Sequence, residues 1–124
     1  IEARAMWDIA SKQILPVVVE YATLLAHSVN EVRTASSAAC TCVQEDMLCE
    51  VSSLLKEMKE ALDSLWARIQ EAADKAEGEE QARFFKTVVE PAMNALRRPA
   101  DRLEMLVAKD MWPMPSYGDL LFEV

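Results

Sequence analysis

The feature that most constrains the fold is an apolar heptad seam in the middle of the chain. Nine apolar residues recur there in alternating steps of three and four, without a break over four heptads. They are Leu48, Val51, Leu55, Met58, Leu62, Leu65, Ile69, Ala72 and Ala76. This period places every member on one face of an α-helix. Leu54, Ala61 and Trp66 widen the stripe, which favours a helix with two neighbours rather than one.

A second seam with the same rhythm follows the first. It consists of Ala82, Phe85, Val89, Ala92, Leu96, Pro99, Leu103 and Leu106. Thr41 and Gln44 have the spacing of a capping box, which predicts that the first of these helices starts near residue 42. Gly78 is its expected C-terminal stop. A connection this short makes the two helices antiparallel; the less favoured alternative is one continuous helix through residue 78.

The N-terminal third of the chain predicts a further amphipathic helix. Its expected stripe is Met6, Ala10, Ile14, Val17, Tyr21, Leu24 and Ser28, with Ile9, Val18 and Leu25 beside it. The small residues at 34–39 predict a loop after it. Pro16, Pro91 and Pro99 each remove a backbone hydrogen bond inside a helix, so each predicts a kink. For Pro99 the alternative is that it is the first residue of a separate short helix.

These patterns predict an all-α fold, an elongated antiparallel three-helix bundle with kinked helices. The expected bundle covers residues 1–110, with helices at about 2–33, 42–77 and 79–109. Residues 111–124 are expected to form an extended C-terminal strap, because prolines at 113 and 115 forbid a helix there.

The strap is too apolar for a free tail, so we expect it to dock. Its possible interface residues are Trp112, Pro113, Tyr117, Leu120, Leu121 and Phe122. Two alternatives stay open: the strap folds back along the bundle, or it reaches a catalytic domain or a neighbouring subunit.

Charge and hydropathy limit the classes of partner. The net charge is −8, and residues 44–81 hold eleven acids against four bases. An acidic chain repels phosphate backbones, which counts against nucleic acid and anionic membranes as partners. The acids are expected to form a solvated helix face. No run of about 18 uninterrupted apolar residues occurs, so no membrane span is expected.

A search for chemistry predicts no catalytic, cofactor-binding or metal site. Cys40, Cys42 and Cys49 form no even disulfide framework, which favours free thiols in a cytosolic protein. With the lone His27 they fall short of a zinc ligand set. A basic cluster at 97–102 is expected to pair along its own helix, with binding of a partner's phosphate or carboxylate as the alternative.

Three stretches of the sequence resemble one known family. They are IEARAM with KQILP (residues 1–6 and 12–16), VVEPAMNALR (88–97) and WPMPSYGDLLFEV (112–124). Each is similar to the C-terminal region of type III glutamine synthetases, and the last stretch is the most specific. Residues 34–80 share only their helical character with that family. The segment with Cys40 and Cys42 has no counterpart that we can name.

The resemblance implies a parent enzyme that joins ammonia to glutamate with ATP and a divalent metal, Mg²⁺ or Mn²⁺. It implies a large cytoplasmic homo-oligomer of stacked rings, in which the metal, nucleotide and glutamate ligands lie on a catalytic domain upstream. No catalytic residue carries over to this chain. We expect a fragment, a non-catalytic C-terminal helical domain. Its partners would be the catalytic domain of the same chain and neighbouring subunits.

The rival interpretation is an independent helical-bundle interaction module that recruits a partner through a bundle face or the Trp-Pro tail. The residues that precede Ile1 would separate the two, because the first interpretation requires a catalytic domain there. A small helical enzyme is a third class. It would need ionisable residues clustered in a cavity, and the sequence shows no such pattern.

Overall fold

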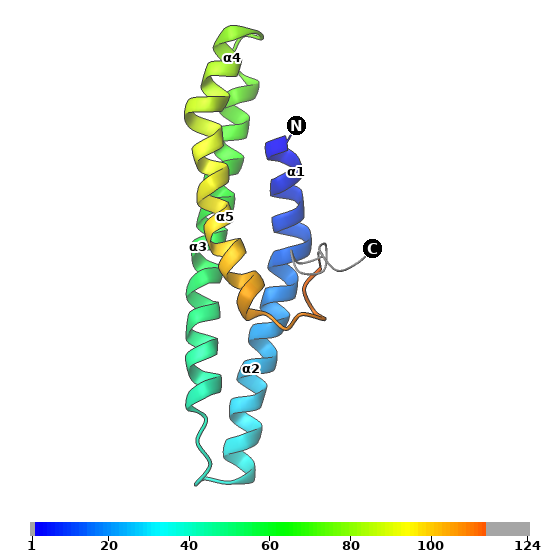
Figure 1. Ribbon diagram of the computed structural model, residues 1–124, viewed down its shortest axis with the longest axis vertical. Coiled ribbons are helices and arrows are strands. Elements are labelled where there is room, and N and C mark those ends of the chain that lie inside the picture. Colours follow the sequence, from blue (N-terminus) through cyan, green and yellow to red (C-terminus); the bar gives the residue numbers. More distant parts are fainter. Residues whose placement is uncertain (1, 114–124) are drawn as a thin grey trace.

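Three long helical segments pack side by side in the computed structural model, which describes residues 2–113 (Figure 1). The second and third segments form an antiparallel hairpin, and the first segment lies along it. The elements are α1 (Glu2–Ile9), the π-helical turn η1 (Ala10–Ile14), α2 (Leu15–Ala35), α3 (Cys42–Ala73), α4 (Glu79–Phe84), the π-helical turn η2 (Phe85–Val89) and α5 (Glu90–Leu106). The predicted all-α bundle is therefore confirmed, and residues 114–124 of the strap lie outside the described residues.

The helix ends lie close to the predicted ones. The first segment continues to Ala35 where 33 was expected, and α3 starts at 42 but ends at Ala73 instead of 77. The third segment starts at 79 and ends at Leu106 instead of 109. It ends there because Val107 adopts an extended conformation, with φ −73° and ψ 144°.

The sequence had suggested that Gly78 ends the second segment, but in the structure Gly78 directly precedes the third segment. Helix α3 has already ended at Ala73. Gly78 has φ +104°, a conformation that side chains disfavour, and its carbonyl accepts the first hydrogen bond of α4 from Ala82 N at 3.0 Å. The glycine thus reverses the chain, and a single continuous helix is excluded.

The hairpin core follows the predicted seams closely. From α3 the residues that are at most 2% exposed are Val51, Met58, Leu62 and Leu65. The third segment contributes Val89, Leu96, Pro99 and Leu103. The last seam member, Ala76, lies beyond the end of α3 and is exposed.

A π-helical turn precedes two of the three helix-breaking prolines. Pro16 follows η1, where Leu15 N–H bonds to Ala10 O, and Pro91 follows η2, where Glu90 N–H bonds to Phe85 O. A proline ring clashes with the carbonyl one turn earlier and leaves it without a donor. The wider turn takes in an extra residue at that point, so the helix continues past the proline. Pro99 instead lies inside α5, in the core.

The π turn at η1 shifts the buried face of the first segment. The predicted stripe is right up to Ile14, and Val18 then takes the place predicted for Val17. Leu25 is 8% exposed, whereas Leu24, which was predicted on the stripe, is 51% exposed. The predicted centre of the stripe is therefore displaced by one residue after Ile14, because the turn adds one residue, while Val17 and Tyr21 of the predicted stripe stay half-buried against the core.

Polar contacts fix the first segment against α3. Trp7 Nε1 donates to Leu62 O at 3.0 Å, and the Trp7 and Trp66 rings lie 4.7 Å apart. At the other end Arg33 pairs with Glu45. The Thr41 hydroxyl donates to Glu45 Oε1 at 2.8 Å. The predicted helix start is correct, but the predicted capping box does not form, because Thr41 bonds a carboxylate instead of a backbone N–H.

One helix within the described residues is long and apolar enough to cross a membrane. It is Glu2–Ala35, whose most apolar window has a mean hydropathy of 1.3. The core helix of a soluble protein or an N-terminal signal sequence can also be this long and apolar. Here the helix packs against α3 and α5. The expectation of no membrane span stays a prediction.

Candidate functional site

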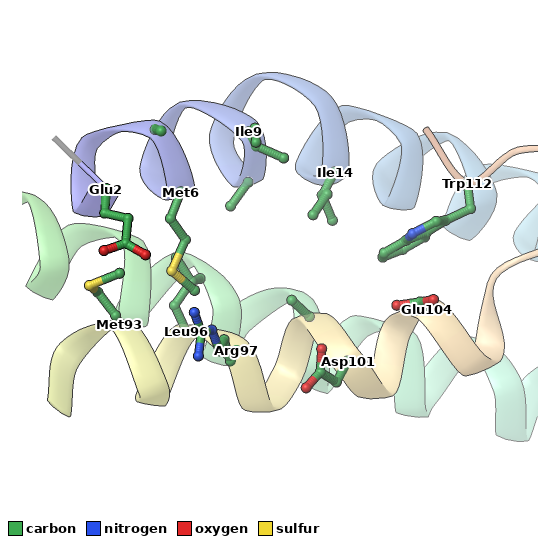
Figure 2. Close-up of a pocket in the computed structure, with 13 residues that line it drawn as sticks. Glu2, Met6, Ile9, Ile14, Met93, Leu96, Arg97, Asp101, Glu104 and Trp112 are labelled. Atoms are coloured by element: carbon green, nitrogen blue, oxygen red, sulfur yellow. The ribbon is translucent and has the colours of Figure 1, made fainter. Parts of the chain in front are cut away.

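An apolar groove lies between the first segment and α5 (Figure 2). Its volume is about 380 Å³. Glu2 and Met93 lie at one end of it and Trp112 lies at the other. We call this surface the α1–α5 groove, and its lining comes from α1, η1, α5 and the turn that follows α5.

The floor of the groove belongs to the faces that also build the core. Ala10, Ile14, Met93 and Leu96 line the groove, and all four are buried. The half-buried lining residues are Met6, Ile9, Ala100, Glu104 and Trp112. Methionine side chains adapt to irregular partners, which suits a contact surface as well as a core.

Charged residues border this apolar floor. The rim carries three carboxylates, from Glu2, Asp101 and Glu104, and one guanidinium, from Arg97. At neutral pH the rim is therefore acidic, and it favours a partner with basic groups around an apolar contact.

A short turn after α5 places Trp112 at the groove. Val107 is extended and 4% exposed, so the chain stays close to the bundle. Ala108 O then accepts hydrogen bonds from Met111 N at 2.9 Å and from Trp112 N at 3.2 Å. These bonds turn the chain back, and the half-buried Trp112 ring lies toward Ile14 (Figure 2).

The predicted interface residues are placed only in part. Trp112 lines the groove, and Pro113 is exposed directly after it. The other four predicted residues, Tyr117, Leu120, Leu121 and Phe122, lie outside the described residues. The docking of the strap therefore stays a prediction.

The tip of the bundle carries a second apolar hollow. The α3–α4 hairpin extends past the start of α1, so its last turns lack a third helix beside them (Figure 1). The hollow has a volume of about 500 Å³, and its larger apolar lining residues are Ile69, Phe85 and Val89. Arg4 lies on its border and also contacts the Trp66 ring, 5.6 Å from the ring centroid.

Of the ionisable residues singled out in the sequence, Arg97 and Asp101 lie on the rim of the α1–α5 groove, whereas His27, Arg102 and the three cysteines line neither hollow. His27 is on the surface, 4.0 Å from Glu31. Arg102 pairs across the hairpin with Glu50 of α3 at 2.7 Å, so its expected pairing along its own helix was wrong. Within residues 2–113, no group of three or more His, Cys, Asp or Glu residues could hold a metal ion.

Sequence reasoning missed the groove because its residues had been assigned to the core. Met6 and Met93 lie on or beside the predicted stripes, and periodicity alone does not show which part of a stripe stays uncovered. Trp112 was the available signal, since a tryptophan beside a proline in a non-helical segment requires burial somewhere.

Comparison with known proteins gives matches along the whole chain. The chain is 31% identical over 126 aligned residues to a type-3 glutamine synthetase of Dictyostelium discoideum, and the match covers 98% of the chain. It is 25% identical to a glutamine synthetase of Bacteroides fragilis, again over 98% of the chain. The matched region is 17% of each of these relatives, so the chain spans about a sixth of their length. No family model and no solved structure matches it.

Proposed function

We propose that this chain, which is homologous over its whole length to one segment of glutamine synthetases, is a non-catalytic helical domain of such an enzyme, with a structural or assembly role. In this proposal the parent is a cytoplasmic homo-oligomer that joins ammonia to glutamate with ATP and Mg²⁺ or Mn²⁺. The domain contacts the catalytic domain of its own chain or a neighbouring subunit.

The observation that supports this role best is the α1–α5 groove. The bundle leaves apolar side chains open along one face and places a tryptophan at the end of that face. Apolar surfaces with a charged border are typical of protein contacts, and large aromatic residues contribute most of the binding energy there. Trp112 is therefore the proposed anchor of the interface.

The donor groups present do not fit an ATP–metal site. Such a site needs clustered oxygen ligands for the metal and backbone or basic groups for the phosphates. The described residues offer no ligand cluster, and the groove rim is mostly acidic, which repels phosphate. We assign ATP and metal to the rest of the parent. Calorimetric titration of this chain with ATP and Mg²⁺ should give no saturable heat at millimolar concentration; a saturable heat would contradict the assignment.

The role is tested by substituting Trp112→Ala in the glutamine synthetase that carries this segment. We expect sedimentation to show smaller species than for the unsubstituted enzyme, because the interface loses its anchor. Met105→Ala is the matched control, since Met105 lies on α5 but is 78% exposed and does not line the groove. An unchanged assembly in the Trp112 variant would contradict a role for the groove in assembly.

The same groove also fits an independent interaction module that recruits another protein. The residues encoded before Ile1 separate the two functions. A glutamine synthetase catalytic domain in that position supports the enzyme domain. An unrelated linker or a translation start supports the independent module.

A further inference from the structure

Two cysteines flank the residue that begins the long middle helix. Cys40 and Cys42 lie on either side of Thr41, and Cys42 is the first residue of α3. Both side chains are exposed. The backbone N–H of Cys42 donates to Cys40 Sγ at 3.4 Å. The turn therefore presents two thiols to solvent and directs a donor at one sulfur.

The residue between the two cysteines is held in place. Thr41 is 6% exposed, and its hydroxyl donates to Glu45 Oε1 at 2.8 Å. Glu45 in turn pairs with Arg33, at the end of α2. The connection between α2 and α3 is thus fixed at its last residue, which lies between the two thiols.

The environment makes the two thiols unequal. Hydrogen bonds from the Cys42 thiol and then from its backbone N–H lower the pKa of Cys40, and the nearby Glu45 and Asp46 carboxylates oppose this effect. The hydrogen bond with Cys40, then its charge, raises the pKa of Cys42. Cys40 is therefore the thiol that ionises first, and Cys42 keeps its proton as a donor. Attack on a disulfide requires a thiolate.

We propose that Cys40 and Cys42 form a thiol–disulfide exchange site for small disulfides of the glutathione type, with Cys40 as the attacking thiol and Cys42 as the resolving thiol. This site is independent of the role proposed above, because it uses neither the groove nor a partner domain.

The exchange proceeds in two balanced steps. The Cys40 thiolate attacks one sulfur of the disulfide, a Cys40–glutathione bond forms, and the other glutathione leaves as a thiolate that takes a proton from water. Cys42 then releases its proton to water and attacks the Cys40 sulfur, and the second glutathione leaves as a thiolate. The protein dithiol loses two electrons and becomes a Cys40–Cys42 disulfide, and the small disulfide gains them and becomes two thiols.

A disulfide between residues two apart is strained, so it is more readily reduced than an ordinary structural disulfide. An excess of small thiol should therefore restore the dithiol. The site would be a reversible point of modification, located where α2 and α3 join.

Cys49 provides an internal comparison. It is exposed and lies on α3, but no other cysteine lies within two residues of it in the sequence. It should react as a single thiol and should retain glutathione when it does react, because no resolving thiol lies beside it.

The test exposes the full chain to oxidised glutathione and follows each cysteine by mass spectrometry. In the unsubstituted chain we expect Cys40 and Cys42 to become linked without attached glutathione. Cys42→Ser should instead accumulate glutathione on Cys40. Cys40 in that variant should react roughly threefold or more faster than Cys42 in Cys40→Ser, because the backbone N–H of residue 42 still donates to Cys40 Sγ after the partner thiol is removed and favours its thiolate.

Cys49→Ser is the matched control and should form the Cys40–Cys42 link at the rate of the unsubstituted chain. Circular dichroism confirms that each variant keeps its helices. Two outcomes would overturn the proposal: equal reaction rates at all three cysteines, or glutathione that stays on Cys40 in the unsubstituted chain as stably as in Cys42→Ser.

Discussion

The α3–α5 hairpin and the first helical segment are built from similar apolar patterns, yet the hairpin keeps its pattern away from its turn, whereas the first segment does not. In the hairpin, seam residues such as Leu65, Leu96 and Leu103 are fully buried where the heptads place them. In the first segment the buried face moves by one position after Ile14. The two regions differ in where the π turn falls. In the third segment η2 precedes most of the seam, whereas η1 interrupts the first stripe.

The comparison shows what a heptad pattern encodes. Steps of three and four describe a regular α-helix. A π turn adds one residue, so every later position on the buried face shifts by one. Proline is the sequence signal for such a turn, because the chain must resolve a clash one turn before it. Pro16 should therefore be treated as a possible change of register and not only as a kink.

The hairpin side of the comparison predicts the largest effect. Leu65→Ala should lower the free energy of unfolding by about 2–5 kcal/mol, because it leaves a cavity at a residue that is 0% exposed. Urea denaturation followed by circular dichroism measures the loss. Val43→Ala, on the same helix at 69% exposure, should change it by less than about 0.5 kcal/mol. Equal losses would mean that the seam does not face the core.

A neighbouring pair of leucines tests the register shift itself. Leu25→Ala should cost about 2–3 kcal/mol, whereas Leu24→Ala should cost well under about 1 kcal/mol. The reason is that Leu25 is 8% exposed and Leu24 is 51% exposed. Melting temperatures of the two variants rank them directly. A larger loss for Leu24→Ala than for Leu25→Ala would mean that the buried face does not shift after Ile14. The first segment would then keep its apolar pattern as the hairpin does.

The contact between the two regions should have a moderate effect. Trp7→Phe removes the hydrogen bond from the indole N–H to Leu62 O and should cost about 1 kcal/mol. Trp66→Phe leaves that bond in place and serves as the control. If both substitutions cost the same, the hydrogen bond does not help to hold the first segment on α3.

The smallest expected effect is at the ion pair across the hairpin. Arg102→Gln should cost at most about 1 kcal/mol, because both partners are partly exposed. The loss should shrink when the measurement is repeated in about 1 M salt. A double-mutant cycle with Glu50→Gln isolates the pair. A cost that does not depend on salt would point to packing by the arginine stem instead of charge.

The sequence predicted the fold well because its strongest signals are local. The seam of α3, the reversal near Gly78 and the helix start after Thr41 all follow from periodicity and backbone preference. The end of α3 at Ala73 was harder to predict, since alanine and charged residues allow a helix to continue through 74–77. The Thr41–Glu45 hydrogen bond could not be predicted in this way, because the Glu45 carboxylate also makes a tertiary contact with Arg33 of α2.

The candidate site was predicted less completely. Trp112 was identified from its composition and context, and the structure places it at a groove. The groove itself depends on how far the first segment lies from α5, and no local pattern reports that separation. The ion pair between Arg102 and Glu50 of α3 was missed for a similar reason. Acidic residues on the arginine's own helix were near enough in sequence to be its expected partners, and no local pattern indicated α3.

The pairing of a π turn with a proline has a consequence for comparing related chains. A π turn is equivalent to an α-helix with one residue inserted. A relative that lacks one residue at 10–14, and also lacks the proline at 16, should still form a continuous helix with the same downstream face buried. An alignment gap of one residue inside this helix would therefore mark the loss of a π turn and not a broken helix.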